Sequence, residues 1–110
     1  MFKLADELAI KIYRSTDKFP VAERFGLQSQ LRRAGVSAPT NIVEGCARDS
    51  ETEYLRFLEI AFSSCREGIY VSDLSLRLNF LEARAARELE QLGGRTAAAI
   101  AALRKGIRGA

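Results

Sequence analysis

Hydrophobic residues recur at helical spacing along the chain, and charged residues occupy many of the positions between them. In the first segment Leu8, Ile12 and Thr16 lie four residues apart, with Lys11 among the charged residues between them. This spacing gathers the apolar side chains on one side of a helix. The pattern therefore predicts an amphipathic helix over residues 2–16.

Three further segments show the same spacing. The pattern Ser50-x-x-Glu53 precedes the longest of them, and Ser as N-cap with Glu three positions later is typical of a helix start. Helices are expected over 21–47, from 51 to a turn at 79–82, and from there to a fraying end at 105–110. Because short loops join the four helices and no strand-like alternation occurs, we predict an all-α fold, an antiparallel four-helix bundle forming one domain over residues 1–110.

Pro39 interrupts the second of these helices. Proline has no backbone N–H, and its ring presses on the carbonyl four residues earlier, which here belongs to Gly35. The second helix is therefore expected to be kinked or broken at Pro39. Pro20 stands where that helix is expected to begin, a position at which the missing N–H costs nothing.

The third helix carries two apolar stripes on nearly opposite sides. One contains Leu58, Phe62 and Cys65, and the other consists of Phe57, Ile60, Val71, Leu74 and Leu78. A helix of a monomeric bundle needs one such stripe, so the second predicts an interface between copies of the chain. A third helix packed on both sides within one chain would produce the same pattern.

The charge balance is mildly basic, and its surplus lies at one end of the chain. The 110 residues contain 17 Lys and Arg against 14 Asp and Glu, a net charge of +3. Residues 1–81 are balanced, so the whole surplus belongs to residues 82–110. Most of the basic residues are Arg, which suits phosphate contacts and interfacial carboxylates, although genomic base composition would give the same bias. The balance indicates a weak preference for anionic partners.

The composition argues against an enzyme. With no His in the chain, Ser-His and Cys-His dyads and di-iron bundles are excluded. Cys46 and Cys65 lie 19 positions apart without a CxxC motif, so two buried, reduced thiols are expected rather than a metal or redox site. The acidic pairs, such as Glu51 and Glu53, stand near helix starts, where they stabilise the helix dipole. We therefore predict no catalytic site, no metal, no cofactor and no small-molecule substrate.

The N-terminal segment lacks the apolar core of a signal peptide, because charged residues such as Lys3 and Asp6 interrupt it. No stretch approaches the roughly 18 consecutive apolar residues of a membrane span. A cytoplasmic, soluble protein without a membrane partner is expected.

Polar residues in the second helical segment form a candidate site. Gln30, Ser37, Asn41 and Glu44 recur at intervals of seven, four and three, close to one helical face. The structural explanation is that Ser37, Asn41 and Glu44 satisfy backbone groups freed by Pro39. The functional alternative is a phosphate-binding strip formed with three arginines that could equally pair with carboxylates across an interface: Arg32, Arg33 and Arg48.

The same stretch resembles a known family of small four-helix-bundle proteins, first described from intervening sequences of large-subunit ribosomal RNA genes. Its signature has the sense Phe-Pro, Glu, Phe-Gly-Leu, Gln-Leu-Arg-Arg-Ala, Ser-x-Pro-x-Asn-Ile, Glu-Gly and Arg, and every term occurs between Phe19 and Arg48. The residues that the resemblance marks as structural are Gln30, Ser37, Pro39, Asn41, Glu44 and Gly45. The chain departs from the family at Ala38, Phe62, Gly68 and Gly93-Gly94, and it lacks a Trp in the first helix.

The resemblance implies a ring-shaped homopentamer of four-helix protomers. A related branch supplies the accessory protein of diversity-generating retroelements, whose basic pentamer is thought to engage nucleic acid and a reverse transcriptase. We therefore expect a non-enzymatic oligomer that associates with RNA or DNA. The alternative is a scaffold for a protein partner, such as a reverse transcriptase, with no direct role in nucleic-acid binding. Candidate nucleic-acid contacts are Arg32, Arg33, Arg48, Arg104, Lys105 and Arg108.

Overall fold

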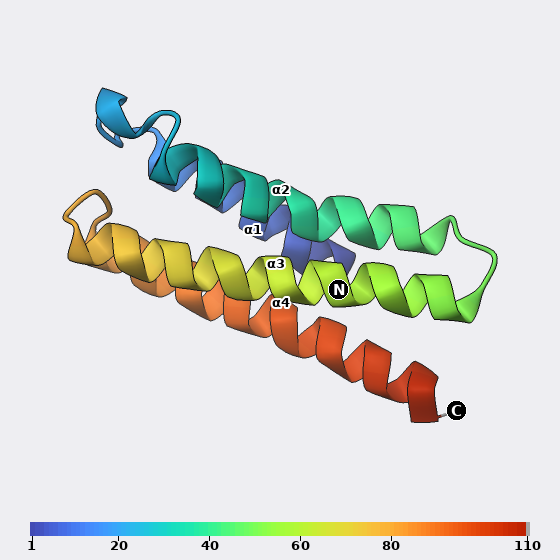
Figure 1. The fold of residues 1–110 in the computed structure, drawn as a ribbon. Coiled ribbons are helices and arrows are strands. Elements are labelled where there is room, and N and C mark those ends of the chain that lie inside the picture. Colours follow the sequence, from blue (N-terminus) through green and yellow to red (C-terminus); the bar gives the residue numbers. More distant parts are fainter. Residues whose placement is uncertain (110) are drawn as a thin grey trace.

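The computed structural model describes residues 1–109 and confirms the predicted all-α, antiparallel four-helix bundle (Figure 1). Successive helices run in opposite directions along a body that measures 45 × 22 × 18 Å. No strand occurs in residues 1–109. The elements are α1 (Phe2–Thr16), the 3₁₀ helix η1 (Val21–Glu23), α2 (Leu27–Cys46), α3 (Glu51–Arg77) and α4 (Ala83–Gly109).

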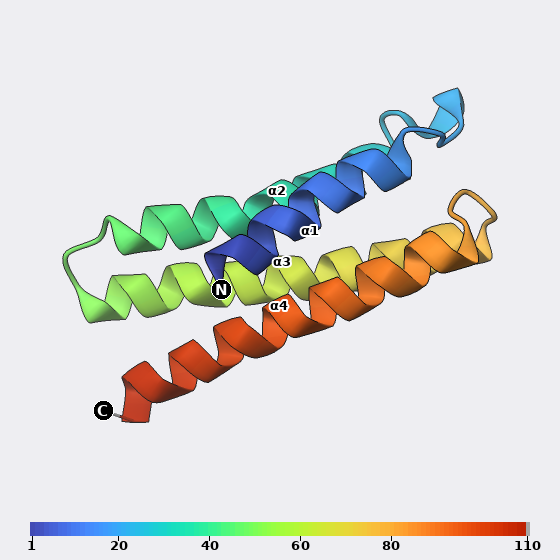
Figure 2. The same ribbon diagram turned by 180° about the vertical axis from the view of Figure 1, so that it is seen from behind.

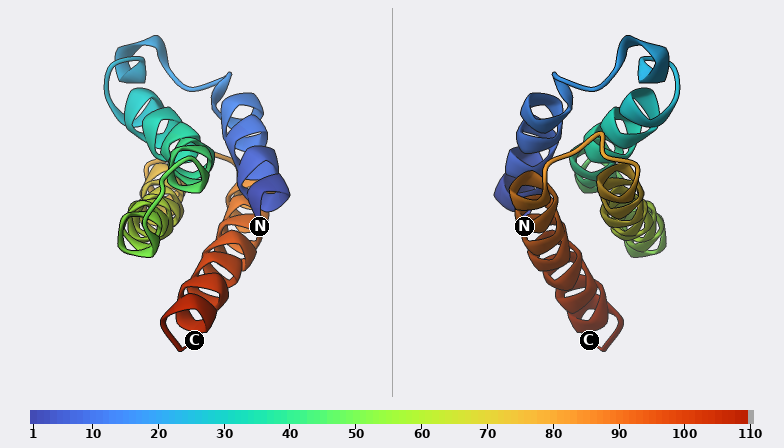
Figure 3. Two further views of the ribbon diagram at one scale, coloured as in Figure 1. Left: turned by 90° about the vertical axis from the view of Figure 1, so that its right-hand side faces the viewer. Right: turned by 90° about the vertical axis from the view of Figure 1, so that its left-hand side faces the viewer.

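The helices pack as neighbours around one core. α3 packs against α2 and α4, and α1 packs against α2 and α4 on the other side, as the end-on views of Figure 3 show. Because α1 is the shortest helix, it covers only the part of the bundle nearest η1 (Figure 2). The fully buried large side chains of the core are Ile12, Leu31, Ile42, Leu58, Val71, Leu89 and Ile100. Removing this apolar surface from water is the main force that holds the helices together.

Two glycines allow the helices to approach closely. A Cβ added at Gly35 would lie 2.7 Å from Cδ1 of Ile12, and one at Gly93 would lie 2.8 Å from Cγ1 of Ile69. Both distances are shorter than a non-bonded carbon contact allows. Gly93, the first residue of the glycine pair in α4, is therefore a point of close packing against α3.

Specific caps begin and end α3. The Ser50 hydroxyl accepts a hydrogen bond from the backbone N–H of Glu53 at 3.1 Å, which confirms the predicted N-cap. At the other end Asn79 has a φ of 66°, and the N–H of Phe80 donates to the Ser75 carbonyl at 2.9 Å. This left-handed residue followed by a bond back into the last turn is a Schellman motif, with Asn in the position usually taken by Gly. It turns the chain sharply into α4.

The second helix differs from its prediction at the start. α2 begins at Leu27 instead of residue 21, so residues 20–26, here named the hook, form a projecting segment that contains η1. Phe19 is buried against Phe80, with ring centroids 6.1 Å apart, and Glu23 accepts a hydrogen bond from the N–H of Leu27 at 3.0 Å. These contacts anchor both ends of the hook.

α2 is unbroken at Pro39, since a single helix runs from Leu27 to Cys46. Of the two predicted alternatives, a broken helix is therefore wrong, whereas a kink of α2 at Pro39 stays a prediction. Pro39 is buried where α2 packs against its neighbours. This packing outweighs the local cost of a proline within a helix, which is about 3 kcal/mol.

Two smaller expectations were also wrong. α4 continues to Gly109 instead of fraying from residue 105; Ala110 lies outside the described residues. Cys65 is buried as predicted, but Cys46 is exposed near the end of α2. Burial raises the pKa of the Cys65 thiol to about 11.

No helix in the described part of the chain combines the length and apolar character needed to cross a membrane.

Candidate nucleic-acid interface

The outward side of α4 carries a row of exposed basic residues, here named the α4 face. Arg87, Arg95 and Lys105 are exposed on it, and residues 91, 98 and 102 between them are Gln, Ala and Ala. Steps of three and four residues keep these positions on one side of a helix. Arg87 and Lys105 lie 18 residues apart, about 27 Å along the axis. Glu90 is exposed one turn from Arg87, but residues 91–110 contain no acidic residue, so the α4 face is cationic from Arg95 to Lys105.

Ion pairing divides the basic residues of α4. Glu88 pairs with Lys11 at 2.6 Å and with Arg84 at 3.5 Å, and the Lys11 hydrogen bond and charge lower the pKa of Glu88. Within residues 1–109, no acidic side chain pairs with Arg87, Arg95, Lys105 or Arg108. These exposed cations are therefore available to bind an anion from solution.

Arg104 points inward, unlike its neighbour Lys105. Its side chain is only 17% exposed and lies 3.8 Å from Glu59 of α3, with its guanidinium 6.0 Å from the centre of the Phe62 ring. The buried Nε of Arg104 has no hydrogen-bond partner among the described residues. Arg104 thus packs between α3 and α4, and the structure does not place it with the other predicted nucleic-acid contacts.

A second basic surface is a groove over the outer side of α2, bounded by the hook and the end of α1. This groove, the α2 groove, has a volume of about 970 Å³ and is lined by Tyr13, Asp17, Arg24, Phe25, Gln28, Ser29, Arg32, Arg33, Val36, Ser37, Thr40, Asn41 and Glu44. Arg24 and Arg33 are exposed there, and neither pairs with an acidic side chain in the part of the chain that the structure describes. Most of the lining side chains are polar.

Arg32 is held by α1 and acts as a structural cap. Its Nε donates to the Thr16 hydroxyl at 2.8 Å, and its guanidinium carbon lies 4.5 Å from the centre of the Tyr13 ring. One Nη is 3.3 Å from a carboxylate oxygen of Asp17. A cation at the C-terminal end of α1 satisfies the helix dipole there. Arg32 therefore joins α1 to α2, whereas the adjacent Arg33 faces the α2 groove.

The polar strip predicted on α2 forms a hydrogen-bonded contact with α3. Asn41 donates from Nδ2 to the Ser37 carbonyl at 2.8 Å and to its hydroxyl oxygen at 3.0 Å. The Ser37 and Ser64 hydroxyls are hydrogen-bonded at 2.7 Å, and Gln30 contacts Glu67 at 3.5 Å. Ser37 and Asn41 thus have a structural role, but the carbonyl that Asn41 satisfies belongs to Ser37 and not to Gly35, so the link to Pro39 is not confirmed.

The remaining residues of the motif lie near the end of α2. Gly45 packs closely on α3, because a Cβ there would be 3.0 Å from atoms of both Tyr54 and Phe57. Glu44 is exposed and lines the α2 groove. Arg48 is exposed, and its guanidinium stacks 4.8 Å from the centre of the Phe57 ring. Arg48 therefore remains accessible to an anion.

The second apolar stripe of α3 divides between the core and the surface. Val71 is 1% exposed and belongs to the core, so its assignment to an interface between copies was wrong. For this residue the alternative of a third helix packed on both sides within one chain holds, because α3 packs against both α2 and α4. Phe57 and Leu74 are half-buried. Ile60 and Leu78 are 40% and 48% exposed and remain candidates for contact with another copy.

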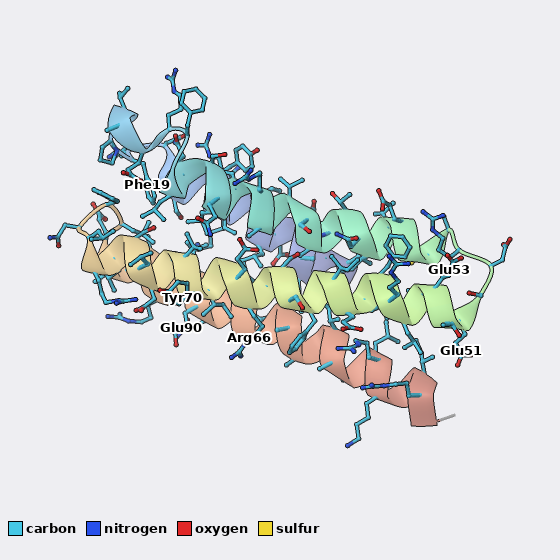
Figure 4. The ribbon with its side chains drawn as sticks, in the orientation of Figure 1. Phe19, Glu51, Glu53, Arg66, Tyr70 and Glu90 are labelled. Atoms are coloured by element: carbon cyan, nitrogen blue, oxygen red, sulfur yellow. The ribbon has the colours of Figure 1, made fainter. Side chains whose placement is uncertain are left out.

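Two glutamates, Glu51 and Glu53, stand at the start of α3, and their position fits a role in stabilising the helix. Glu51 and Glu53 lie at the end of the bundle remote from Phe19, whereas Arg66 lies near the middle of α3, and Tyr70 and Glu90 lie closer to the Phe19 end (Figure 4). Both carboxylates are exposed in the first turn of α3, where negative charge stabilises the helix dipole. Among the described residues, no group of His, Cys, Asp and Glu could hold a metal ion.

Sequence reasoning missed several members of both basic surfaces. Arg87 and Arg95 belong to the α4 face, and Arg24 and Phe25 belong to the α2 groove. The spacing of Arg87, Arg95 and Lys105 was a usable signal, because intervals of eight and ten residues keep the three side chains within about a quarter turn of one another. For Phe25 no such signal existed, because its 90% exposure follows from the projecting hook and not from a helical pattern.

Comparisons with known proteins agree with the family resemblance. The family model described as 23S rRNA-intervening sequence protein matches residues 1–102. A crystal structure of a protein of unknown function from the S23 ribosomal protein family of Bacteroides thetaiotaomicron is similar, with a TM-score of 0.86 and 23% sequence identity. The match covers 94% of this chain and 97% of that one, and at this identity it shows the fold alone. No curated protein matches the chain.

Proposed function

This chain belongs to the 23S rRNA-intervening sequence protein family, and from that premise we propose that it is a non-enzymatic homo-oligomer that associates with RNA. In this proposal five copies form a ring, and the exposed basic side chains of the α4 face contact the phosphates. The contacts are sequence-tolerant, because phosphate contacts position a nucleic acid without reading its bases.

The observation that carries the proposal is the α4 face itself. Arg87, Arg95 and Lys105 are exposed along about 27 Å of helix, and Arg108 near its end is a fourth exposed cation without an acidic side-chain partner in residues 1–109. Cations on a regular helical surface can follow a run of phosphates and release the counterions condensed on it. One copy would bind weakly, but five copies with a net charge of +3 each carry +15, and several weak contacts on one particle raise the overall affinity.

Assembly is supported by the surface of α3. Ile60 is 40% exposed and Leu78 is 48% exposed, and burying such side chains contributes about 25 cal/mol for each Å² removed from water. The number five comes from the family resemblance. The absence of catalysis is supported by the sequence, since a chain without His lacks the commonest general base.

A protein scaffold is the second candidate, and other exposed apolar side chains favour it. Tyr70 and Val43 are 59% and 55% exposed, and aromatic and aliphatic side chains in such positions are typical of surfaces that meet another protein. In that case the basic residues would serve solubility and the pairing of subunits, and the protein would bind no RNA.

The test is light scattering behind size exclusion at two salt concentrations, with and without a generic RNA. A particle of five protomers that binds RNA at low salt and releases it at high salt is the expected result. An oligomer that ignores RNA at both salt concentrations would favour the scaffold. A monomer without affinity for RNA would contradict both candidates.

A further inference from the structure

The α2 groove presents an exposed aromatic ring beside unpaired arginines. Phe25 is 90% exposed at the tip of the hook, and the exposed Arg24 and Arg33 line the same groove. Leaving a phenyl ring in water carries a cost that burial against a partner would remove. The groove therefore has the chemistry to take a partner that offers both a flat apolar surface and negative charge.

The backbone that carries Phe25 is held in place before any ligand arrives. Phe19 is buried in the bundle below one end of the hook, and at the other end the Glu23 carboxylate accepts from the N–H of Leu27. The turn is tight, since a Cβ added at Gly26 would lie 2.7 Å from Oε1 of Glu23. A ring carried on an ordered backbone loses less conformational entropy on binding than a ring on a flexible loop.

The floor of the groove is polar and equally ordered. Arg32 is held against Tyr13 and Thr16, and Gln28 donates from its side-chain amide to the Thr16 carbonyl at 2.8 Å. Ser29 and Thr40 add hydroxyl groups along the outer side of α2. The volume of about 970 Å³ is at the upper end of the range for ligand pockets, about 300–1,000 Å³.

We propose that the α2 groove binds a single-stranded segment of a polynucleotide, with one base stacked on Phe25 and neighbouring phosphates held by Arg24 and Arg33. This inference rests on the proposed association with RNA and adds a second, distinct surface to it. Unpaired bases expose their flat faces, and aromatic side chains that stack on them next to a basic groove are the general means of binding single strands. A duplex hides the faces of its bases, so it gains nothing from Phe25.

The polar lining favours a polynucleotide over a second copy of the chain. An apolar helix of another copy would cover Phe25 and Val36 but would also desolvate Arg24, Arg33 and Gln28 without supplying partners for them. A strand of nucleic acid supplies phosphates for the arginines and base edges for the amide and hydroxyl groups. The groove also contains Asp17 and Glu44, and Asp17 is already paired with Arg32 at 3.3 Å.

The experiment compares the affinity of the full chain and its variants for labelled oligouridylate of about 12 nucleotides, a length within the site sizes of single-strand binders. Matched single-stranded DNA and duplex RNA are the other arms. Phe25→Ala should weaken binding of the single strand about fivefold or more, the effect of losing one stacked base, and Phe25→Tyr should stay within about twofold of the wild type because it keeps the ring. Val21→Ala is the matched control, since Val21 is 81% exposed on the same hook but does not line the groove.

The expected pattern is loss with Phe25→Ala, no change with Val21→Ala, and duplex affinity unaffected by either variant. The DNA arm shows whether the groove distinguishes the sugar. Equal affinities of wild type and Phe25→Ala for the single strand would overturn the inference while leaving RNA association through the α4 face intact. A change of particle mass in Phe25→Ala would also overturn it, because the hook would then join copies of the chain. A wild type that binds no RNA would remove the proposed function together with this inference.

Discussion

The outer sides of α2 and α4 differ in shape and in charge, although both are helices of one small bundle. α2 has three charged residues in Leu27–Cys46, and its outer side is hollowed beneath the hook. α4 has eight in Ala83–Gly109, six of them basic, and its Arg87 lines a hollow of about 190 Å³ together with Asp73 and Glu90. A convex cationic helix can attract phosphates but cannot enclose a base, whereas a groove with an exposed ring can. From this difference we infer that phosphate affinity would belong to α4 and the selection of single strands to α2, if the protein binds RNA as proposed.

Reversing the charge of the α4 face should have the largest effect. Combined Arg87→Glu, Arg95→Glu and Lys105→Glu should weaken RNA binding about 100-fold or more at low salt, because three phosphate contacts become repulsive. Filter binding or fluorescence anisotropy measures the loss.

The matched control for this variant makes the same change of charge elsewhere. Lys3→Glu, Arg14→Glu and Arg56→Glu alter exposed residues that have no acidic partner within residues 1–109. This control should retain most of the affinity. Equal losses in the two triple variants would mean that net charge, and not the α4 face, attracts the RNA.

Breaking the assembly should reveal how far both surfaces depend on multiple copies. Ile60→Glu places a charge on the exposed part of the α3 stripe and should reduce the particle to single protomers without loss of helicity. Light scattering and circular dichroism report the two properties. Thr52→Glu, at an exposed position in the first turn of α3 and two turns away from Ile60, is the control and should leave the mass unchanged. A full-size particle of Ile60→Glu would show that copies do not meet at this residue.

The two adjacent arginines of α2 should behave differently in stability. Arg32→Ala removes the bond to the Thr16 hydroxyl and the contact with the Tyr13 ring, and should cost about 1–3 kcal/mol of unfolding free energy. Arg33→Ala changes an exposed side chain and should stay within about 0.5 kcal/mol of the wild type. Urea denaturation followed by circular dichroism measures both. Similar stabilities of the two variants would contradict the capping role of Arg32.

The smallest effect is expected on the inner side of α4. Arg104→Met keeps the apolar stem packed between α3 and α4 and removes an ion pair of 3.8 Å, so RNA affinity should be unchanged. Lys105→Met, one residue further along the same helix, should weaken binding and reduce its salt dependence. The RNA affinities of the two variants are measured side by side. They test whether a basic residue of α4 contributes to RNA binding only when its side chain faces outward. A larger loss with Arg104→Met than with Lys105→Met would reverse that assignment.

Local signals explain why much of the fold could be predicted. The bounds of α1 and the cap at Ser50 depend on spacing and on side chains within one turn, and both were confirmed. The hook depends on contacts between Phe19 and Phe80, which lie 61 positions apart in the sequence, and no local pattern announces such a contact. The direction of Arg104 and the burial of Val71 depend on how the helices cross. Composition located the basic surplus in residues 82–110, but only the packing shows which of its cations face outward.

Salt dependence tests the division between the two surfaces most directly. The affinity for single-stranded RNA is measured at several salt concentrations for the wild type, the α4-face triple variant and Phe25→Ala. Each lost phosphate contact should reduce the slope of log affinity against log salt concentration by about 0.7 for a single strand. The account predicts a flatter slope for the α4-face variant, and for Phe25→Ala an unchanged slope at lower affinity. An unchanged slope in the α4-face variant, or a slope flattened by Phe25→Ala, would contradict it.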